Sequence, residues 1–399
     1  MSSSPSPRPC SSPSRTSIEE GTGPVTNTDA VTRFAVPTRV HAGLGALGDL
    51  GEVLGELGAR RVAVVGDRGL AESGALDGVL SAVPGTLTRI VLPVAPDPDV
   101  AAVEALATAA RAEGCDVVIG VGGGSALGAA KAVAIRLTNE LTIDRYEIGG
   151  HPLASRPAPS VAIPTTAGSG SEVSKVLVLH EESRGNELIV RADGVEPKVA
   201  LLDGRLLRGA PRSVVLYSGL DALSHAMEAQ WSKHCSSAAM VLALAAARTI
   251  LDLLPEAVEG AEDGRNRGGS NDEVLQKLLE ASCHANMACG NAGLALVHAL
   301  SSSVHVKIAH GRQNGALLPV VSSFYRPVSG LETTHLVRRL SGLYTRLGFR
   351  PGEVTAEFPA GAVDLIIQAA AKHPFRWNGR RDASDENLRL LLLSAGVPN

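Results

Sequence analysis

The chain has 399 residues, of which 44% are hydrophobic and 20% are charged. This length and balance suit a globular protein of about two domains and exclude wholesale disorder. The formal net charge of −4 predicts neither a nucleic-acid-binding surface nor attachment to an anionic membrane. No apolar stretch in the sequence reaches the roughly 20 residues that cross a bilayer. Five scattered cysteines predict no disulfide framework, and we expect a cytoplasmic protein.

The first 32 residues are rich in serine and proline. They contain no apolar run of the roughly 7–15 residues that a secretory signal requires. We therefore expect residues 1–32 to form a disordered tail that carries no catalytic group.

Residues 33–205 alternate short, β-branched apolar runs with alanine-rich helical stretches. Asp99 is a suitable N-cap for one of these helices. Strands with continuous apolar character that alternate with helices predict a parallel sheet covered on both faces, as in a Rossmann-like domain. The expected strands are residues 61–65, 89–94, 116–121, 161–164 and 199–202.

Residues 206–399 contain no further strand pattern and are expected to form a helical domain. Helical periodicity is found in residues 221–230, 238–254 and 274–287. We expect Pro255 to end the second of these helices. The polar, glycine-rich residues 256–273 are then expected to form a surface loop.

The first candidate site is the turn Gly122-Gly123-Gly124-Ser125, which follows a strand and begins a helix. Glycines allow the backbone to approach a phosphate, and the helix N-terminus favours an anion. Asp67 ends another strand, where a carboxylate can accept hydrogen bonds from ribose hydroxyls and favours NAD over NADP. A plain tight turn is the alternative.

The second candidate site is the loop from Pro164 to Glu172, which includes Thr165, Thr166 and Ser169. Its small hydroxyl residues follow a strand, at the sheet edge where open α/β sheets bind ligands. A solvated Ser/Thr turn is the alternative interpretation.

The third candidate site contains a carboxylate and several imidazoles. Asp221 and His225 are four residues apart and share one helix face, and His298, His305 and His310 follow in an apolar segment. Such a nitrogen and oxygen set suits Fe²⁺ or Zn²⁺. Asp221 and His225 alone would also fit a simple hydrogen-bonded pair. The remaining histidines, His180 and His373 among them, are expected to be structural or solvated.

Together, these segments resemble the iron-containing (group III) alcohol dehydrogenase family. The resemblance runs from about Phe34 to Ala395. It rests on the motifs GGGSALGAAK (122–131), IPTTAGSGSEVS (163–174), SGLDALSHAMEA (218–229) and LALVHAL…HGRQNGALLP (294–319), in that order. It implies the two-domain fold shared with dehydroquinate synthase, with a cleft between the domains.

The resemblance also implies the ligand sets. It places a divalent metal on Asp221, His225, His298 and His310, with Fe²⁺ favoured and Zn²⁺ as the alternative. It places NAD(H) along Asp67 and the residues Gly122, Gly123, Gly124, Ser125, Thr165, Thr166 and Ser169. The chemistry implied is hydride transfer between an alcohol or aldehyde carbon and nicotinamide, with the metal as a Lewis acid.

Three positions depart from the family pattern. Gly128 replaces an aspartate, Glu187 replaces a lysine, and Ser302 replaces a histidine linked to proton relay. His305 lies seven residues after His298, about two helical turns, so it could replace that histidine as general acid/base. Ser302 and His305 are therefore the candidate catalytic positions, and a histidine packed on its helix is the alternative.

The sequence thus predicts a divergent, NAD(H)-linked alcohol dehydrogenase or aldehyde reductase. Its departures suggest a specialised tailoring enzyme of natural-product synthesis that acts on a small alcohol or aldehyde or on a peptide hydroxyl. A homo-oligomer is expected, as for relatives. The alternatives are a non-redox NAD and metal enzyme of the dehydroquinate synthase type, and a partner-dependent protein with weakened cofactor binding.

Overall fold

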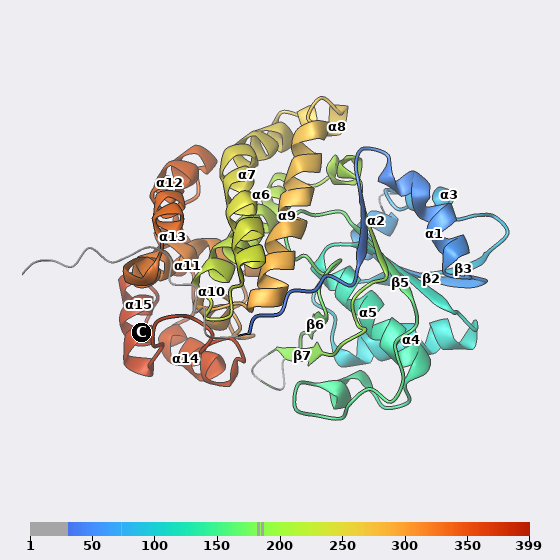
Figure 1. Cartoon of the computed structure of the whole chain (residues 1–399), viewed down its shortest axis with the longest axis horizontal. Helices are drawn as coiled ribbons and strands as arrows, with labels where there is room; N and C mark the ends of the chain where they lie inside the picture. The colour runs from blue at the N-terminus through green and yellow to red at the C-terminus, as the bar shows by residue number, and fades with distance from the viewer. Residues whose placement is uncertain (1–30, 73, 182–183, 185–186) are drawn as a thin grey trace, which may run out of the picture.

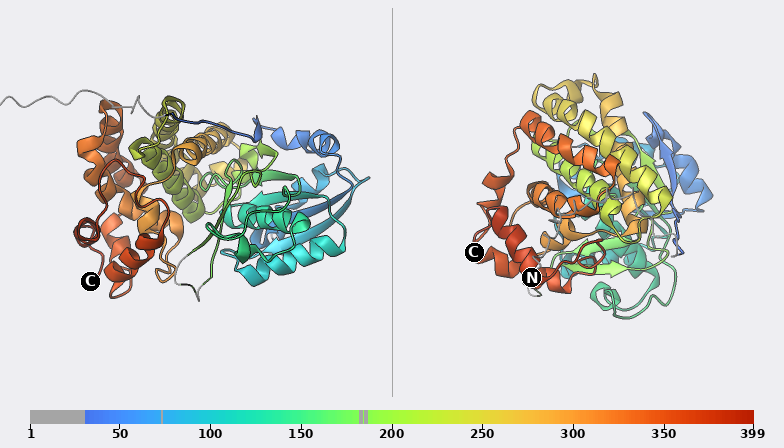
Figure 2. Two further views of the ribbon diagram at one scale, coloured as in Figure 1. Left: turned by 60° about the horizontal axis from the view of Figure 1, so that its bottom comes forward. Right: turned by 60° about the vertical axis from the view of Figure 1, so that its left-hand side comes forward.

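The computed structural model describes residues 31–72, 74–181, 184 and 187–399 (Figure 1). The predicted tail, residues 1–32, lies almost wholly outside these residues. A sheet with its covering helices forms one half of the molecule, and a helical assembly forms the other (Figures 1 and 2). The fold class expected from the sequence is confirmed.

The sheet has six parallel strands in the order β1-β8-β5-β4-β2-β3. All five predicted strands are present, and the structure adds β1 at one edge. Their bounds are β1 Arg39–Ala42, β2 Arg61–Asp67, β3 Thr88–Val94, β4 Val117–Gly122, β5 Ser160–Pro164 and β8 Val199–Leu202.

Alternate residues of β2 face opposite layers of helices. Ala63 and Val65 belong to the apolar cluster under α4 (Val100–Ala112) and α5 (Gly124–Thr138), whereas Val62 and Val64 belong to the cluster under α1 (Leu50–Glu56) and α3 (Asp77–Ala82). This double coverage explains why the strand is apolar throughout. Asp99 caps α4 by accepting a hydrogen bond from the Ala102 amide at 2.7 Å, as expected.

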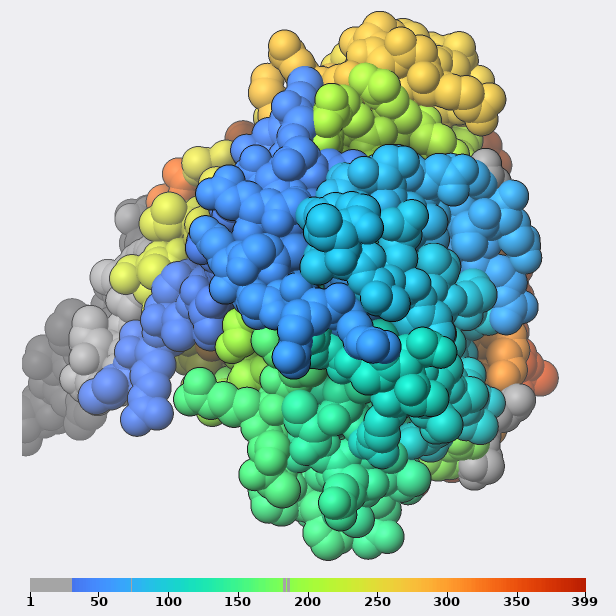
Figure 3. All heavy atoms as spheres, turned by 90° about the vertical axis from the view of Figure 1, so that its right-hand side faces the viewer, coloured from blue at the N-terminus to red at the C-terminus, as the bar shows by residue number. Residues whose placement is uncertain are grey.

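Shorter elements connect these layers: η1 Ala46–Asp49, α2 Arg68–Glu72, η2 Ile143–Tyr146 and η4 Gly204–Leu207. Figure 3 shows that the N-terminal part of the described chain, coloured blue to cyan, forms most of the outer face of this half.

A two-stranded antiparallel hairpin, β6 (Val176–Leu179) and β7 (Leu188–Arg191), was not expected from the sequence. Leu177 and Leu179 of β6 are buried in the same apolar cluster as α5. The hairpin therefore lies next to the helix that begins at the glycine-rich turn.

The helical half is built around α6, α7 and α9, which pack against one another. The shorter helices α13 to α15 complete it at the far end (Figure 2). The bounds are α6 Arg212–Trp231, α7 Ser237–Glu262, α8 Arg265–Gly268, α9 Asp272–Ala292, α10 Leu296–Leu300, α11 His310–Tyr325, η5 Arg326–Val328, α12 Leu331–Leu347, α13 Pro351–Thr355, α14 Ala362–Lys372 and α15 Asp385–Ser394.

Two expectations for this half were wrong. Pro255 does not end a helix, because α7 continues through it to Glu262. Pro255 is buried, and packing of α7 against α6 and α9 outweighs the backbone hydrogen bond that proline removes. Residues 256–273 are accordingly not one loop, because they hold the end of α7, all of α8 and the start of α9.

By length and composition, α7 is the one helix among the described residues that could cross a membrane. It packs against α6, α9 and α12.

Candidate active site

The glycine-rich turn between β4 and α5 is closely packed by the other predicted cofactor-binding residues. Gly122 has φ +142°, and a Cβ there would lie 3.1 Å from the Cβ of Asp67. A Cβ on Gly123 would lie 3.3 Å from Thr166 Oγ1, and one on Gly124 would lie 3.0 Å from the Cβ of Ser169. Side chains at these three glycines would collide with the surrounding residues. Their absence leaves the backbone of the turn accessible to a phosphate.

The loop after β5 joins the two halves of the molecule. Thr165 donates its backbone N–H to the Gly122 carbonyl at 3.1 Å, and the Gly168 carbonyl accepts hydrogen bonds from Ser282 Oγ and Asn286 Nδ2 of α9. Gly170 has φ +61°, and a Cβ there would overlap Asn286. The loop is thus held between the sheet and α9.

Lys131 of α5 fixes the same loop from the other side. Its fully buried ammonium donates to the carbonyls of Ser171 at 3.0 Å, Ser174 at 3.1 Å and Val176 at 2.5 Å. Burial lowers the pKa of Lys131 to about 7, and burial raises the pKa of neighbouring Glu172 to about 7. Lys131 therefore has a structural role in positioning the loop.

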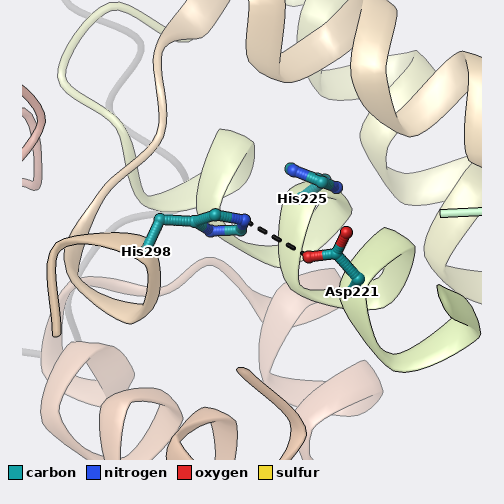
Figure 4. A group of neighbouring side chains, drawn as sticks. All are labelled: Asp221, His225 and His298. Carbon is teal, nitrogen blue, oxygen red and sulfur yellow. Dashed lines mark ion pairs between the residues drawn. The ribbon is translucent and has the colours of Figure 1, made fainter. Parts of the chain in front are cut away.

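Three of the four predicted metal ligands converge. Asp221 and His225 project from α6, His298 projects from α10, and one ligand atom from each lies within 4.8 Å of the other two (Figure 4). The His298 Nε2 atom is 3.4 Å from Asp221 Oδ1, and the rings of His225 and His298 stack with centroids 4.5 Å apart. All three residues are buried.

The fourth predicted ligand, His310, lies beside this group as the first residue of α11. Its Nε2 atom is 3.8 Å from Asp221 Oδ1, and its ring centroid is 5.2 Å from that of His298. Its side chain is 41% exposed, whereas that of Asp221 is 10% exposed. His310 therefore forms the side of the cluster that opens to solvent.

The charges of the cluster depend on one another. Burial opposes ionisation of Asp221, but the imidazoles of His225, His298 and His310 outweigh it and hold the pKa of this carboxyl below its usual range. Burial lowers the pKa of His225 to about 3, although Asp221 opposes this shift. One ionised carboxylate among buried imidazoles is a donor set that suits a divalent transition metal.

Glu228, which the sequence analysis missed, orients His298 from behind. This fully buried carboxylate accepts backbone hydrogen bonds from Ala295 at 3.1 Å and Val297 at 2.6 Å, and its second oxygen contacts His298 Nδ1. Burial alone would lower the pKa of His298, but Glu228 and Asp221 raise it to about 10. The sequence did contain a signal for Glu228, because residues 221, 225 and 228 lie on the same face of α6.

Asn314 of α11 was also missed. Its fully buried amide nitrogen lies 2.7 Å from Asp221 Oδ1, 3.2 Å from His298 Nε2 and 3.0 Å from His310 Nε2. Three predicted metal-binding atoms therefore share one amide group.

A cleft of about 1150 Å³ connects the glycine-rich turn with the metal cluster. It is lined by Gly124, Ser125, Thr166 and Ser169 and by Asp221, His225, His298 and His310. His180 and His373, which the sequence analysis set aside, line it as well. The residues present thus fit a dinucleotide and a divalent cation side by side.

The structure does not bring the two candidate catalytic positions into this cleft. Because α10 ends at Leu300, the expected two-turn helical spacing between His298 and His305 is wrong, and His305 is exposed on a turn. Ser302 is buried, with its hydroxyl donating to the Ala299 carbonyl at 2.9 Å. A proton-relay role for either residue stays a prediction that this placement does not favour.

The other two departures from the family pattern do line the cleft. A Cβ on Gly128 would meet nothing closer than the Val178 carbonyl at 3.8 Å, so a small side chain would fit there. The Glu187 side chain is 13% exposed, and burial raises its pKa against the opposing charges of His310 and His298.

A parallel dinucleotide-binding sheet, a helical half and a metal cluster in one cleft define the class of two-domain, metal-dependent dehydrogenases. Comparison with known proteins agrees. Residues 37–204 match the family model "Iron-containing alcohol dehydrogenase", and residues 215–372 match the model of the C-terminal part of that family.

Individual relatives and solved structures agree as well. The chain is 34% identical to long-chain-alcohol dehydrogenase 1 of Geobacillus thermodenitrificans, over 80% of this chain and 78% of the relative. It is 32% identical to an NAD-dependent methanol dehydrogenase of Bacillus methanolicus, over 79% and 82%. Its fold is similar to that of sulfoacetaldehyde reductase from Bifidobacterium kashiwanohense in complex with NAD⁺, with TM-score 0.81 and 25% identity over 92% and 99% of the two chains. The chain belongs to the iron-containing alcohol dehydrogenase family and is an NAD-dependent oxidoreductase acting on CH–OH groups.

Proposed function

We propose that this chain interconverts an alcohol and its aldehyde by hydride transfer to or from NAD, with a divalent cation held by Asp221, His225, His298 and His310. The observation that carries the proposal is the single cleft in which the metal cluster and the glycine-rich turn lie together. Metal-dependent hydride transfer to NAD requires both features in one cleft.

The chain's own residues have separate tasks in this reaction. The turn at Gly122, Gly123 and Gly124 would hold the pyrophosphate, and Asp67 at the end of β2 would accept hydrogen bonds from the ribose hydroxyls of NAD. The loop that carries Thr166 and Ser169 would lie along the cofactor, and Lys131 anchors the following part of this loop through the carbonyls of Ser171, Ser174 and Val176.

A divalent cation bound at the cluster would act as a Lewis acid toward the substrate oxygen. Glu228 keeps the His298 ring oriented so that Nε2 faces Asp221. Bound NAD⁺ would supply the acceptor for the carbinol hydrogen as hydride in the oxidation direction, and the half-exposed side of the cluster at His310 would give the hydroxyl proton a way to solvent.

Further assignments belong to the same proposal. We propose Fe²⁺ as the metal and a cytoplasmic homo-oligomer, and free thiols at Cys115, Cys235, Cys283 and Cys289 support a reducing compartment. The altered cleft positions Gly128 and Glu187 support a specialised substrate, such as an alcohol or a peptide hydroxyl in natural-product tailoring.

The test is metal analysis of anaerobically purified protein, followed by an NADH absorbance screen with alcohols and aldehydes. We expect about one divalent metal per chain, and NADH formation that a chelator abolishes. The variant Asp221→Asn should lose both the metal and the activity. Cofactor turnover that does not depend on metal, or no binding of NAD by the metal-loaded protein, would refute the proposal.

A further inference from the structure

The cleft contains a histidine that none of the tasks above uses. His373 directly follows the last residue of α14, and it lines the same cleft as His298 and His310. Its ring meets that of Phe375, another lining residue, edge to face at a centroid distance of 5.4 Å. His373 therefore lies in the part of the cleft beside the metal cluster.

The hydrogen bonding of His373 indicates which of its nitrogens carries the proton. The backbone N–H of Phe375 donates to His373 Nδ1 at 3.4 Å, so Nδ1 is an acceptor. In a neutral imidazole the other nitrogen then carries the hydrogen. Burial and the nearby imidazoles of His298 and His310 lower the pKa of His373 to about 3, so the ring is neutral at physiological pH.

The Nε2 atom of His373 is the nitrogen left for a ligand. Within the described residues it makes no hydrogen bond, and it is not among the fully buried polar atoms that lack a partner, while His373 itself lines the cleft. His373 thus has one unused donor that a ligand in this cleft can reach.

The segment that carries His373 is firmly anchored. Buried Arg376 donates twice to the Ala383 carbonyl, at 2.9 and 2.7 Å. Asn378 Nδ2 donates to the carbonyl of Leu294, another cleft residue, at 3.1 Å. Because the segment is held in place before a ligand binds, the direction of the His373 donor is set in advance.

We propose that His373 is a specificity-determining residue that donates a hydrogen bond to a second, uncharged oxygen of the substrate. The preferred substrates are then alcohols and aldehydes that carry a hydroxyl, ether or carbonyl oxygen besides the reacting one. A purely aliphatic chain would bury the Nε2–H group without a partner, which disfavours its binding. This inference rests on the proposed function.

The test compares two alcohols with the same number of heavy atoms, butan-1-ol and 2-methoxyethanol. The ether oxygen of the second can only accept a hydrogen bond. Because that oxygen also changes the reactivity of the carbinol, the measured quantity is the ratio of the two kcat/KM values in each variant. The variants are His373→Leu and His373→Gln, with His335→Leu on the exposed face of α12 as control. Thermal unfolding establishes that each is folded.

We expect His373→Leu to lower the ratio of 2-methoxyethanol to butan-1-ol by about 10-fold, mainly through KM for 2-methoxyethanol. His373→Gln, which keeps a donor, should retain part of the ratio, and His335→Leu should keep all of it. An unchanged ratio in His373→Leu, with both alcohols oxidised, would overturn this inference and leave the proposed function standing. If the metal-loaded protein oxidises neither these alcohols nor any in the screen, both fail.

Discussion

The Glu228 carboxylate lies behind His298 and contacts its Nδ1 atom, while His298 Nε2 lies 3.4 Å from Asp221 on the other side. A buried imidazole between two carboxylates has a fixed orientation and a fixed tautomer. The arrangement leaves Nε2 for the cation, as in carboxylate–histidine–metal triads.

We therefore expect Glu228→Gln to weaken metal binding by about 10- to 100-fold. The glutamine side chain has the same shape, but its amide NH₂ must face either the Nδ1–H of His298 or the backbone N–H groups of Ala295 and Val297. Titration calorimetry on the metal-free protein measures the affinity, and Glu259→Gln at an exposed position of α7 is the control. An affinity equal to that of the wild type would show that Glu228 does not orient His298.

The contacts of Asn314 lead to a second prediction about the metal cluster. Its amide donates to Asp221 Oδ1 at 2.7 Å, so Asn314→Asp places two carboxylates in contact in the metal-free protein. Like charges at this distance destabilise the metal-free state, and a bound cation relieves the repulsion. We expect a lower melting temperature with chelator and a larger rise on adding metal than in the wild type. The control Asn387→Asp lies outside the cleft, in α15, and equal rises in all three proteins would contradict the prediction.

The features of the fold that could be predicted from the sequence are those that a local residue pattern determines. Continuous apolar runs identify β2, β4 and β5, and the four-residue spacing of Asp221 and His225 identifies the stripe of α6 that Glu228 extends. Packing between distant segments decides the rest. The helix α7 continues through Pro255 because α6 and α9 cover it.

The positions of the histidines show most clearly what the sequence alone could not predict. Extending the helix of His298 beyond Leu300 placed His305 in the cleft, but the chain turns there and leaves His305 exposed. His373 has no motif around it, and only the anchoring of Arg376 and Asn378 brings it to the cleft. No periodicity in one sequence contains that information.

A substitution at Gly128 tests whether NAD binding requires the open space between α5 and β6. It lies inside α5, and a Cβ there would make only ordinary contacts, the nearest at 3.8 Å. We expect Gly128→Ala to stabilise the protein by about 0.5–1 kcal/mol through helix propensity, without loss of NAD affinity. Urea unfolding and NAD titration are the measurements. Gly120→Ala is the control with the opposite expected sign. Its new Cβ would lie 2.7 Å from the Cβ of Ala130, so this substitution should destabilise the protein. Loss of stability in Gly128→Ala would show that α5 and β6 cannot accept a methyl group.

Lys131→Met removes the ammonium that holds the loop between β5 and β6, through its carbonyls at Ser171, Ser174 and Val176. The variant leaves three carbonyls without their donor and leaves Glu172 without its neighbouring positive charge. We expect a loss of about 3–5 kcal/mol in unfolding free energy and weaker NAD binding, because the same loop carries Thr166 and Ser169. Lys175→Met, which breaks only the exposed pair with Asp193, should cost less than about 1 kcal/mol. Equal losses of unfolding free energy in the two variants would contradict a positioning role for Lys131.

The burial of His373 predicts a dependence of stability on pH. Its pKa is about 3 in the folded protein against an ordinary value of 6.5, so between these values the unfolded chain binds more protons. The contribution of His373 to stability is therefore complete above pH 6.5 and is lost as the pH falls toward 3. Replacement by glutamine removes this contribution while the nearby His298 and His310 stay in place.

Urea unfolding of the wild type and His373→Gln through this acid range measures the effect. We expect the wild type to lose stability faster than the variant below pH 6.5, and the two curves to run parallel above it. His335→Gln, at an exposed position, should follow the wild type throughout. Parallel curves for His373→Gln and the wild type at every pH would mean that the ring is solvated rather than buried beside the metal cluster.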